Sequence, residues 1–353
     1  MKIFQIISVG IMLMMSLSCE KNTDVIEPDS ALTPRSHTNS PLTLGSTFSR
    51  GFGLNNSGVV AGSVINADGV VVAFTLSHQG IWYSDEPVAS NGLPVIRFSV
   101  NDRGEVAGHK IVPGGISPVV WKNGQAHDLD LLPGYQYGEV FDINASGQMV
   151  GESLNGNYAA PTDYRATVFS LDGGAIDLGT LGGNIASAIG INDKGEIVGF
   201  AETTTPGETR AFLYKDGSMS DLGTLGGPWS NANAINNRSE IVGRSVLADG
   251  FSIRGFLWRD GQMTNIGTLG GNSSVAVDIN DRGEIVGFSR ISSGPFHAFL
   301  YRDGDMVDLG ALLPGPDSRA MSINNNGDVT GYYTRPDGTT HAFLYQNGQM
   351  IEL

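Results

Sequence analysis

Residues 185–225 read IASAIGINDKGEIVGFAETTTPGETRAFLYKDGSMSDLGTL, and the order of apolar runs and turn residues in this stretch decides the fold. The apolar runs are rich in β-branched and aromatic residues, which favours strands over helices. Gly195 and Gly217 end two short turn signals, where glycine readily takes a positive φ. The stretch therefore predicts four short antiparallel strands: 185–192, 196–201, 210–217 and 218–225.

The same pattern recurs along most of the chain. An apolar residue followed by asparagine, then two residues, usually Gly, and an apolar pair ending in Gly occurs at Asn55, Asn101, Asn144, Asn192, Asn236, Asn280 and Asn324. The steps between these asparagines are 46, 43, 48, 44, 44 and 44 residues. Four antiparallel strands in about 44 residues is the size of one propeller blade. We therefore predict an all-β fold, a seven-bladed β-propeller, over residues 42–353.

The two ends of the repeat array complement each other. Residues 349–353 match the fourth strand at 218–222, but the Gly-Thr-Leu-Gly-Gly that follows in complete copies (223–227) is missing there. Residues 42–46 align with this missing piece. An open solenoid needs no such complementarity, whereas a ring does. We therefore expect a closed ring in which Leu42 and Leu353 lie close together.

The N-terminus predicts export. An apolar run from Ile3 to Met15 follows Lys2, and it is too short to span a bilayer comfortably. Ser18 precedes Cys19, the only cysteine, in a pattern that resembles the lipobox of bacterial lipoproteins. We expect a signal peptide at 1–18, lipid attachment at Cys19 and a flexible tether at 19–41. The protein would then be an outer-membrane or cell-surface lipoprotein held by its lipid alone. The alternative is a secreted protein.

Several motifs resemble the "HAF" family of probable extracellular repeats in bacteria. They are His-Ala-Phe-Leu-Tyr (297–301 and 341–345), Asp-Leu-Gly-Thr-Leu-Gly-Gly (221–227) and Ile-Asn-Asp-Arg-Gly-Glu-Ile-Val-Gly (279–287). The resemblance covers nearly everything from residue 42 onward. It implies export and a repeat fold, and it implies no particular activity. One copy departs from the pattern at Ser239, which replaces the turn glycine and would be strained at positive φ.

No residue set identifies a catalytic centre, and we expect no cofactor and no bound metal. The repeated asparagines are better suited to capping their own turns than to forming a ring of ligands. The net charge of −15 argues against a nucleic-acid partner, because binding phosphates requires clustered Lys and Arg. We expect a monomer.

The segments between the second and third strands vary most between copies, and we expect them to be loops on one face of the ring. The longest step contains Asn157, Tyr158 and Tyr164, which are the candidate ligand-binding residues. Tyrosine and asparagine are common in adaptable recognition surfaces. The main hypothesis is a binding or scaffold propeller on the cell envelope, with a glycan or an envelope protein as its partner. The alternatives are a carbohydrate-active envelope enzyme and a purely structural surface component.

Overall fold

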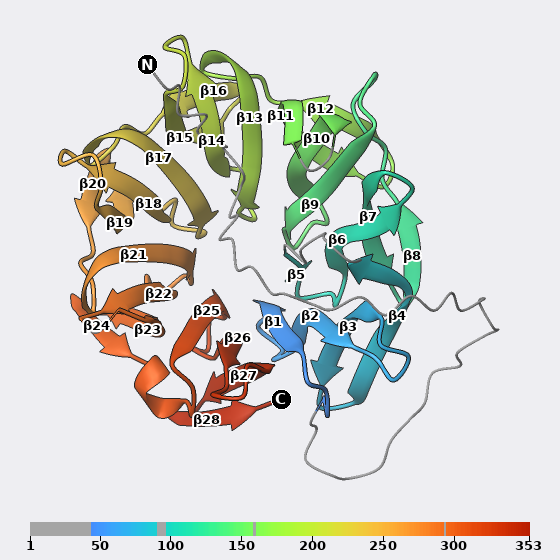
Figure 1. The fold of residues 1–353 in the computed structure, drawn as a ribbon. Helices are drawn as coiled ribbons and strands as arrows, with labels where there is room; N and C mark the ends of the chain where they lie inside the picture. Colours follow the sequence, from blue (N-terminus) through green and yellow to red (C-terminus); the bar gives the residue numbers. More distant parts are fainter. Residues whose placement is uncertain (1–43, 90–96, 158–159, 293) are drawn as a thin grey trace.

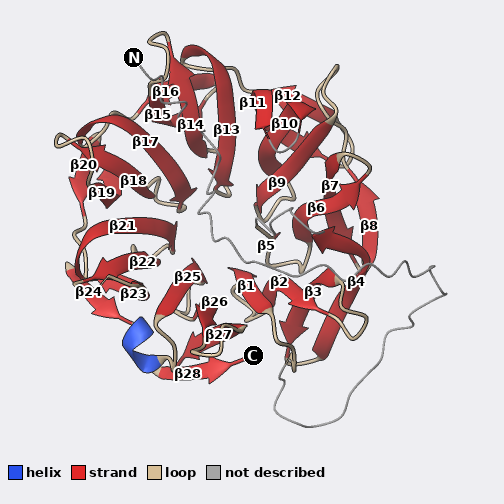
Figure 2. Cartoon of the chain, viewed as in Figure 1, coloured by secondary structure: helices blue, strands red, loops and turns tan. Residues whose placement is uncertain are grey.

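A computed structural model of the chain describes residues 44–89, 97–157, 160–292 and 294–353. These residues form 28 β-strands and one short 3₁₀ helix, η1 (Gly310–Leu312). The strands surround a central axis (Figure 1), and almost the whole ring is drawn as strand in Figure 2. The predicted all-β propeller fold is confirmed.

The strands fall into seven successive groups of four, which we call blades one to seven. Within each blade, neighbours in sequence pair in antiparallel fashion. Blades one to four are β1–β4 (Ser49–Leu54, Val60–Ile65, Val71–Ser77, Gly80–Ala89), β5–β8 (Ser99–Val100, Val106–Val112, Gly115–Lys122, Gln125–Asp128), β9–β12 (Tyr137–Ile143, Met149–Asn157, Ala160–Ser170, Gly174–Asp177) and β13–β16 (Gly182–Ile191, Ile197–Thr203, Thr209–Lys215, Ser218–Asp221). Blades five to seven are β17–β20 (Gly226–Ile235, Ile241–Leu247, Ile253–Arg259, Gln262–Asn265), β21–β24 (Gly270–Ile279, Ile285–Ile291, Phe296–Arg302, Asp305–Asp308) and β25–β28 (Asp317–Ile323, Val329–Thr334, Thr340–Gln346, Gln349–Glu352).

The first strand of each blade lies nearest the axis and the fourth lies at the rim (Figure 1). The repeated asparagine directly follows the first strand, so all seven asparagine turns lie on one face of the ring, which we call the asparagine face. The connections from second to third strands and from blade to blade lie on the opposite face, which we call the loop face.

Blade seven closes the ring against blade one with the contacts that join other blades. The serine hydroxyls of Ser230, Ser274 and Ser318 accept hydrogen bonds from backbone N–H groups of the preceding blade, each at 2.9 Å. Ser49 accepts the equivalent bond from Ala342 of blade seven, also at 2.9 Å. Leu42 lies outside the described residues, but Leu44 packs in one core cluster with Leu353. The ring is therefore closed by side-chain and backbone contacts that bridge the chain ends.

Close packing explains the glycine of the repeated Ile-Val-Gly motif. A Cβ on Gly199 would lie only 1.9 Å from the carbonyl oxygen of Ser187 on the inner strand, and Gly243, Gly287 and Gly331 are equally tight. In six blades a fully buried phenylalanine of the third strand fills the adjoining core: Phe74, Phe169, Phe212, Phe256, Phe299 and Phe343. Each such buried side chain contributes about 1.5–3 kcal/mol to stability.

The segment from Ser153 to Tyr164 is a hairpin and not the loop that we expected. Strands β10 and β11 continue pairing through Leu154–Tyr164 to Asn157–Ala160. The sequence does not predict this pairing, because the segment contains polar residues and a proline and lacks the alternating apolar pattern typical of a strand. Within the described ranges, no helix is long and apolar enough to cross a membrane.

Candidate functional site

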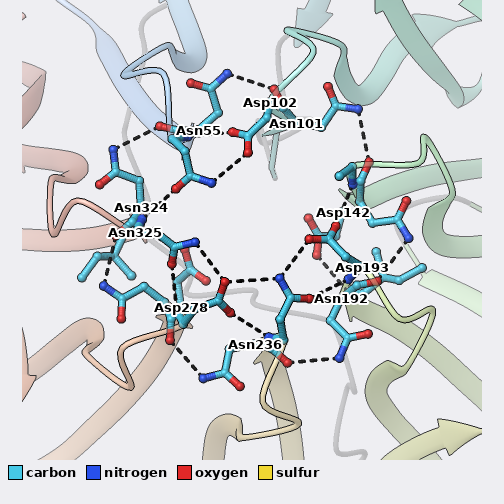
Figure 3. A pocket seen from close by; sticks show the side chains of 18 of the residues that line it. Asn55, Asn101, Asp102, Asp142, Asn192, Asp193, Asn236, Asp278, Asn324 and Asn325 are labelled. Atoms are coloured by element: carbon cyan, nitrogen blue, oxygen red, sulfur yellow. Dashed lines mark hydrogen bonds between the residues drawn. The ribbon is translucent and has the colours of Figure 1, made fainter.

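A ring of seven hydrogen bonds surrounds the central channel at the asparagine face (Figure 3). Each asparagine Nδ2 donates to the backbone carbonyl oxygen of the asparagine in the next blade, at 2.9–3.2 Å. The last of these bonds runs from Asn324 to Asn55 and completes the circle. Each Oδ1 accepts from the backbone N–H groups two and four residues later, as in Asn55 with Ser57 and Val59. The expected turn role is confirmed, and the side-chain amides are committed to structure.

A second ring of polar groups lies directly beside the first. The residues that follow the seven asparagines are Asn56, Asp102, Ala145, Asp193, Asn237, Asp281 and Asn325. Most bond to their neighbours, as Asn56 does with both carboxylate oxygens of Asp102, each at 2.8 Å. Asp102 and Asp193 are exposed, so the channel opens to solvent at this face.

The channel is hollow both within and beneath these rings. Two adjoining cavities of about 190 Å³ and 160 Å³ share Asp142 and Asp278 in their walls. These two aspartates lie on opposite sides of the channel in Figure 3. A volume of this size suits a few waters or a ligand about as large as benzene.

Asp142 joins its blade to both neighbouring blades, and Asp278 joins its blade to the next one. Asp142 accepts from the hydroxyl of Ser99 at 2.7 Å and from the backbone N–H of Ile191 at 2.9 Å. Asp278 accepts from Ser322 and the backbone N–H of Ile323, both at 2.9 Å. Burial raises the pKa of Asp142 to about 6 and raises the pKa of Asp278, while these hydrogen bonds oppose the shift.

Arg97 is the cation of this cavity. Its side chain is buried, and no hydrogen bond or ion pair joins its guanidinium to another described residue. Burial lowers the pKa of Arg97, and the charges of Asp142 and Asp278 raise it. The five N–H donors of a guanidinium need acceptors, so water or a ligand in the cavity must supply them.

The cavity floor toward the loop face is mainly apolar. In six inner strands a β-bulge leaves one residue unpaired: Phe52, Phe141, Ile189, Asn233, Val277 and Met321. A bulge re-aims a side chain, and five of these residues line the smaller cavity. Asn233 is the polar exception, and its Oδ1 is buried without a partner.

A third polar layer, which we call the loop-side layer, lies near the loop-face ends of the first two strands. It contains cross-strand pairs such as Arg50–Ser63, Glu139–Glu152 and Arg319–Tyr332. Of ten buried side-chain N and O atoms that lack a partner in the described residues, eight belong to this layer: Arg50 Nε, Ser63 Oγ, His109 Nδ1, Glu139 Oε2, Ser187 Oγ, Asn231 Oδ1, Arg244 Nε and Arg319 Nε. Folded proteins rarely leave such atoms unpaired, so the concentration indicates bound water or ligand.

Two acids of this layer face each other. Burial raises the pKa of Glu139 well above its usual range, and the charge of Glu152 raises it further. Burial also raises the pKa of Glu152 to about 7. His109 Nε2 lies 3.0 Å from the carbonyl oxygen of Val88 and therefore donates to it, while burial lowers the pKa of His109 to about 4. The Nδ1 atom of His109 lies 3.5 Å from Glu139 Oε2, so the histidine and this acid face each other.

The structure describes the three predicted ligand-binding residues to different extents. Tyr158 lies outside the described residues, and so does Cys19. Asn157 is described only by its backbone, which pairs with Ala160 at the tip of the hairpin. Tyr164 is buried and packs edge-on against Phe200, with ring centroids 6.2 Å apart. Its position gives Tyr164 a packing role, and ligand contact by this residue stays a prediction.

Five residues of the channel and the loop-side layer were not predicted from the sequence: Arg50, Arg97, Asp142, Asp278 and Arg319. The available signal was deviation from the repeat: two residues before the asparagines, other copies have Gly, Ser or Ala where blades three and six have aspartate. No group of three or more His, Cys, Asp or Glu side chains in the described part of the chain is arranged to hold a metal ion.

Comparisons with known proteins support the fold alone. The sequence matches no protein-family model and no curated protein. Its structure resembles the β-propeller domain of the Trilobed protease from Pyrococcus furiosus, with a TM-score of 0.58 and 10% identity, over 86% of this chain and 97% of that one. It also resembles a puromycin-hydrolyzing peptidase from Mycobacterium tuberculosis, with a TM-score of 0.57 and 13% identity, over 88% of this chain and 55% of that one. This chain is a β-propeller. It spans about half the length of that peptidase.

Proposed function

We propose that this propeller is a binding protein of the cell envelope that receives its ligand on the loop face. The observation that carries the proposal is the loop-side layer, where buried side-chain atoms such as Arg50 Nε, Arg244 Nε and Arg319 Nε have no hydrogen-bond partner in the described residues. The asparagine face offers few such atoms, because its amides bond to one another. A rigid ring that holds unpaired polar groups beneath variable connections is a suitable scaffold for recognition.

The ligand that we propose is a glycan or an envelope protein. The paired ends of β10 and β11 lie on the loop face of blade three, and we propose that Asn157 and Tyr158 provide additional ligand contacts. A single chain closes the ring, which supports a monomer as the working unit.

A glycan array and a set of purified envelope proteins test this function on the chain without its first 19 residues. We expect saturable binding that is lost when the hairpin tip is shortened or the loop-side layer is altered. Binding that survives both changes, or no binding to any member of either set, would contradict the proposal.

A second candidate function is hydrolysis of an envelope carbohydrate. The specific observation is that Asp142 and Asp278 line one cavity and that burial raises both pKa values. A carboxyl group with a pKa near 6 can serve as a general acid at neutral pH. The test is release of reducing ends from polysaccharides, with Asp142→Asn as the inactive comparison. Equal release by both proteins would exclude this candidate.

We further propose that Cys19 carries the lipid that holds the protein at the membrane. Replacing Cys19 with Ala is expected to move the protein from the membrane fraction to the soluble fraction or to leave the signal peptide attached. Unchanged processing together with unchanged fractionation would contradict the lipid anchor and favour secretion.

A further inference from the structure

Two arginines of adjacent blades share one aromatic side chain in the loop-side layer. The guanidinium carbon of Arg50, in blade one, lies 4.7 Å from the ring centroid of Tyr332, and that of Arg319, in blade seven, lies 5.9 Å from it. The two guanidinium groups are close enough for the charge of Arg319 to lower the pKa of Arg50. Like charges are therefore held side by side in a buried layer of a protein whose net charge is −15.

These guanidinium groups are poorly supplied with acceptors. Arg319 Nη1 lies 3.5 Å from the Tyr332 hydroxyl, and Arg319 Nη2 lies 3.5 Å from Asp317 Oδ1, the outer limit of a hydrogen bond. The Arg50 guanidinium makes no hydrogen bond or ion pair with any described residue. The Nε atoms of both arginines are buried without a partner. The aromatic rings stabilise the charges but cannot accept in-plane N–H bonds.

The nearby carboxylate does not balance the charge. Asp317 interacts electrostatically with both Arg319 and Arg290, so one negative charge serves two cations. Arg290 itself stacks on Phe296, 4.4 Å from its ring centroid. Arg50 then has no paired anion among the residues that the structure describes. A buried charge without a partner is costly, and the cost is relieved when a counter-charge binds.

We propose that Arg50 and Arg319 form a binding site for an oxyanion, such as a carboxylate or sulfate group on the ligand of the loop face. Planar guanidinium groups bind such groups through paired N–H donors. Arg50 is only partly buried, so an incoming anion can reach it, whereas Arg319 forms the inner wall. The site rests on the proposed binding function and adds the chemistry of the ligand.

The experiment uses defined small anions, so it does not depend on finding the natural ligand. The melting temperature of the chain without its first 19 residues is measured against sodium glucuronate, sodium sulfate, glucose and sodium chloride at constant ionic strength. We expect glucuronate or sulfate to raise it in a saturable manner, and glucose and chloride to have no such effect. A rise in melting temperature with glucuronate alone indicates that the site prefers a carboxylate on a sugar. A rise with sulfate alone indicates that it prefers a tetrahedral anion.

Three variants decide whether Arg50 and Arg319 are responsible. Arg50→Met and Arg319→Met are expected to weaken the apparent affinity at least tenfold, while circular dichroism shows that each remains folded. Arg282→Met removes a guanidinium of the asparagine face, which pairs with Glu284 at 2.7 Å, and this variant should respond as the parent does. If Arg319→Met fails to fold, the partly exposed Arg50→Met and Arg50→Lys give the answer.

An anion response that is equal in the parent and in Arg50→Met would overturn the site, and so would the absence of any saturable response in the parent. These results leave the proposed function standing if the glycan array still shows binding to neutral sugars. Conversely, an anion-induced rise in melting temperature that depends on Arg50, with no binding to the glycan array or to envelope proteins, would support the anion site. It would contradict the proposal of a glycan or envelope-protein partner.

Discussion

Replacing Asn236 with Ala should destabilise the whole ring, because this side chain makes four hydrogen bonds in a buried place. Its Oδ1 accepts from the backbone N–H groups of Arg238 and Glu240, both at 3.0 Å. Its Nδ2 donates to the carbonyl oxygen of Asn280 at 3.0 Å and to Glu240 Oε2 at 2.6 Å. Ala fills none of these roles and leaves several buried groups unpaired.

The size of the effect follows from these contacts. A neutral hydrogen bond contributes about 0.5–1.5 kcal/mol and one to a charged group about 1.5–3 kcal/mol. Three bonds of the first kind and one of the second give about 3–7.5 kcal/mol. The backbone N–H of Arg238 can turn to water, so we expect a loss of about 3–5 kcal/mol in the free energy of unfolding. Asn236→Asp keeps the turn cap but places a carboxylate beside Glu240, so it should lose at least as much at pH 7.

Asn237→Ala is the matched control. Asn237 also bonds to both neighbouring blades, through Asp193 and Asp281, but it is partly exposed and water can replace it. Blade three already has Ala145 at this position, so the expected loss is below about 1 kcal/mol. Urea unfolding followed by tryptophan fluorescence measures both variants, and an unchanged m-value validates the comparison. A loss below about 0.5 kcal/mol for Asn236→Ala, or equal losses for the two variants, would refute the role of the asparagine ring.

Three further changes test other parts of the structure. Burial raises the pKa of Glu152 in the folded protein, so the free energy of unfolding should fall as the pH rises from about 4.5 to about 7. Glu152→Gln should flatten this decline, and its free energy of unfolding should exceed that of the parent by about 3 kcal/mol at pH 8. Unfolding measured at each pH tests this expectation. A decline of unchanged depth would exclude Glu152 as its source. Ser239 has a positive φ of 62°, as expected from the sequence, and its hydroxyl donates to Glu196 at 2.7 Å. Ser239→Ala should lower the free energy of unfolding by about 1.5–3 kcal/mol, and Ser239→Gly by about 1 kcal/mol less, because glycine relieves the backbone strain. Equal losses for the two variants would contradict that strain. Replacing residues 156–162 with Asn-Gly should leave the melting temperature nearly unchanged, because Leu154 and Tyr164 remain, and should weaken ligand binding; unweakened binding would exclude Asn157 and Tyr158.

The repeat could be predicted from the sequence because its residues act within short segments. Asn192 caps a turn that ends at Glu196, and Gly199 lies where the inner strand approaches closely. Asparagine and glycine therefore recur at these positions in every copy of the repeat. The channel residues act between blades. Asp142 accepts from the backbone of Ile191, 49 residues away, and no local pattern records that contact. Arg50 and Arg319 are 269 positions apart in the chain and meet only because the ring closes.

The two ends of the inner strands differ in how their polar groups are used, and this difference supports the proposed ligand site on the loop face. At the asparagine face, the residues that recur in every blade bond to one another, so a new ligand would have to break an existing ring of bonds. At the loop face, the polar residues of the loop-side layer differ from blade to blade: arginine in blades one and seven, glutamate in blade three and serine in blade four. Several of their atoms are buried and unpaired. Repeated residues can only build a repeated structure, whereas an asymmetric ligand requires residues that break the symmetry, and those lie in the loop-side layer.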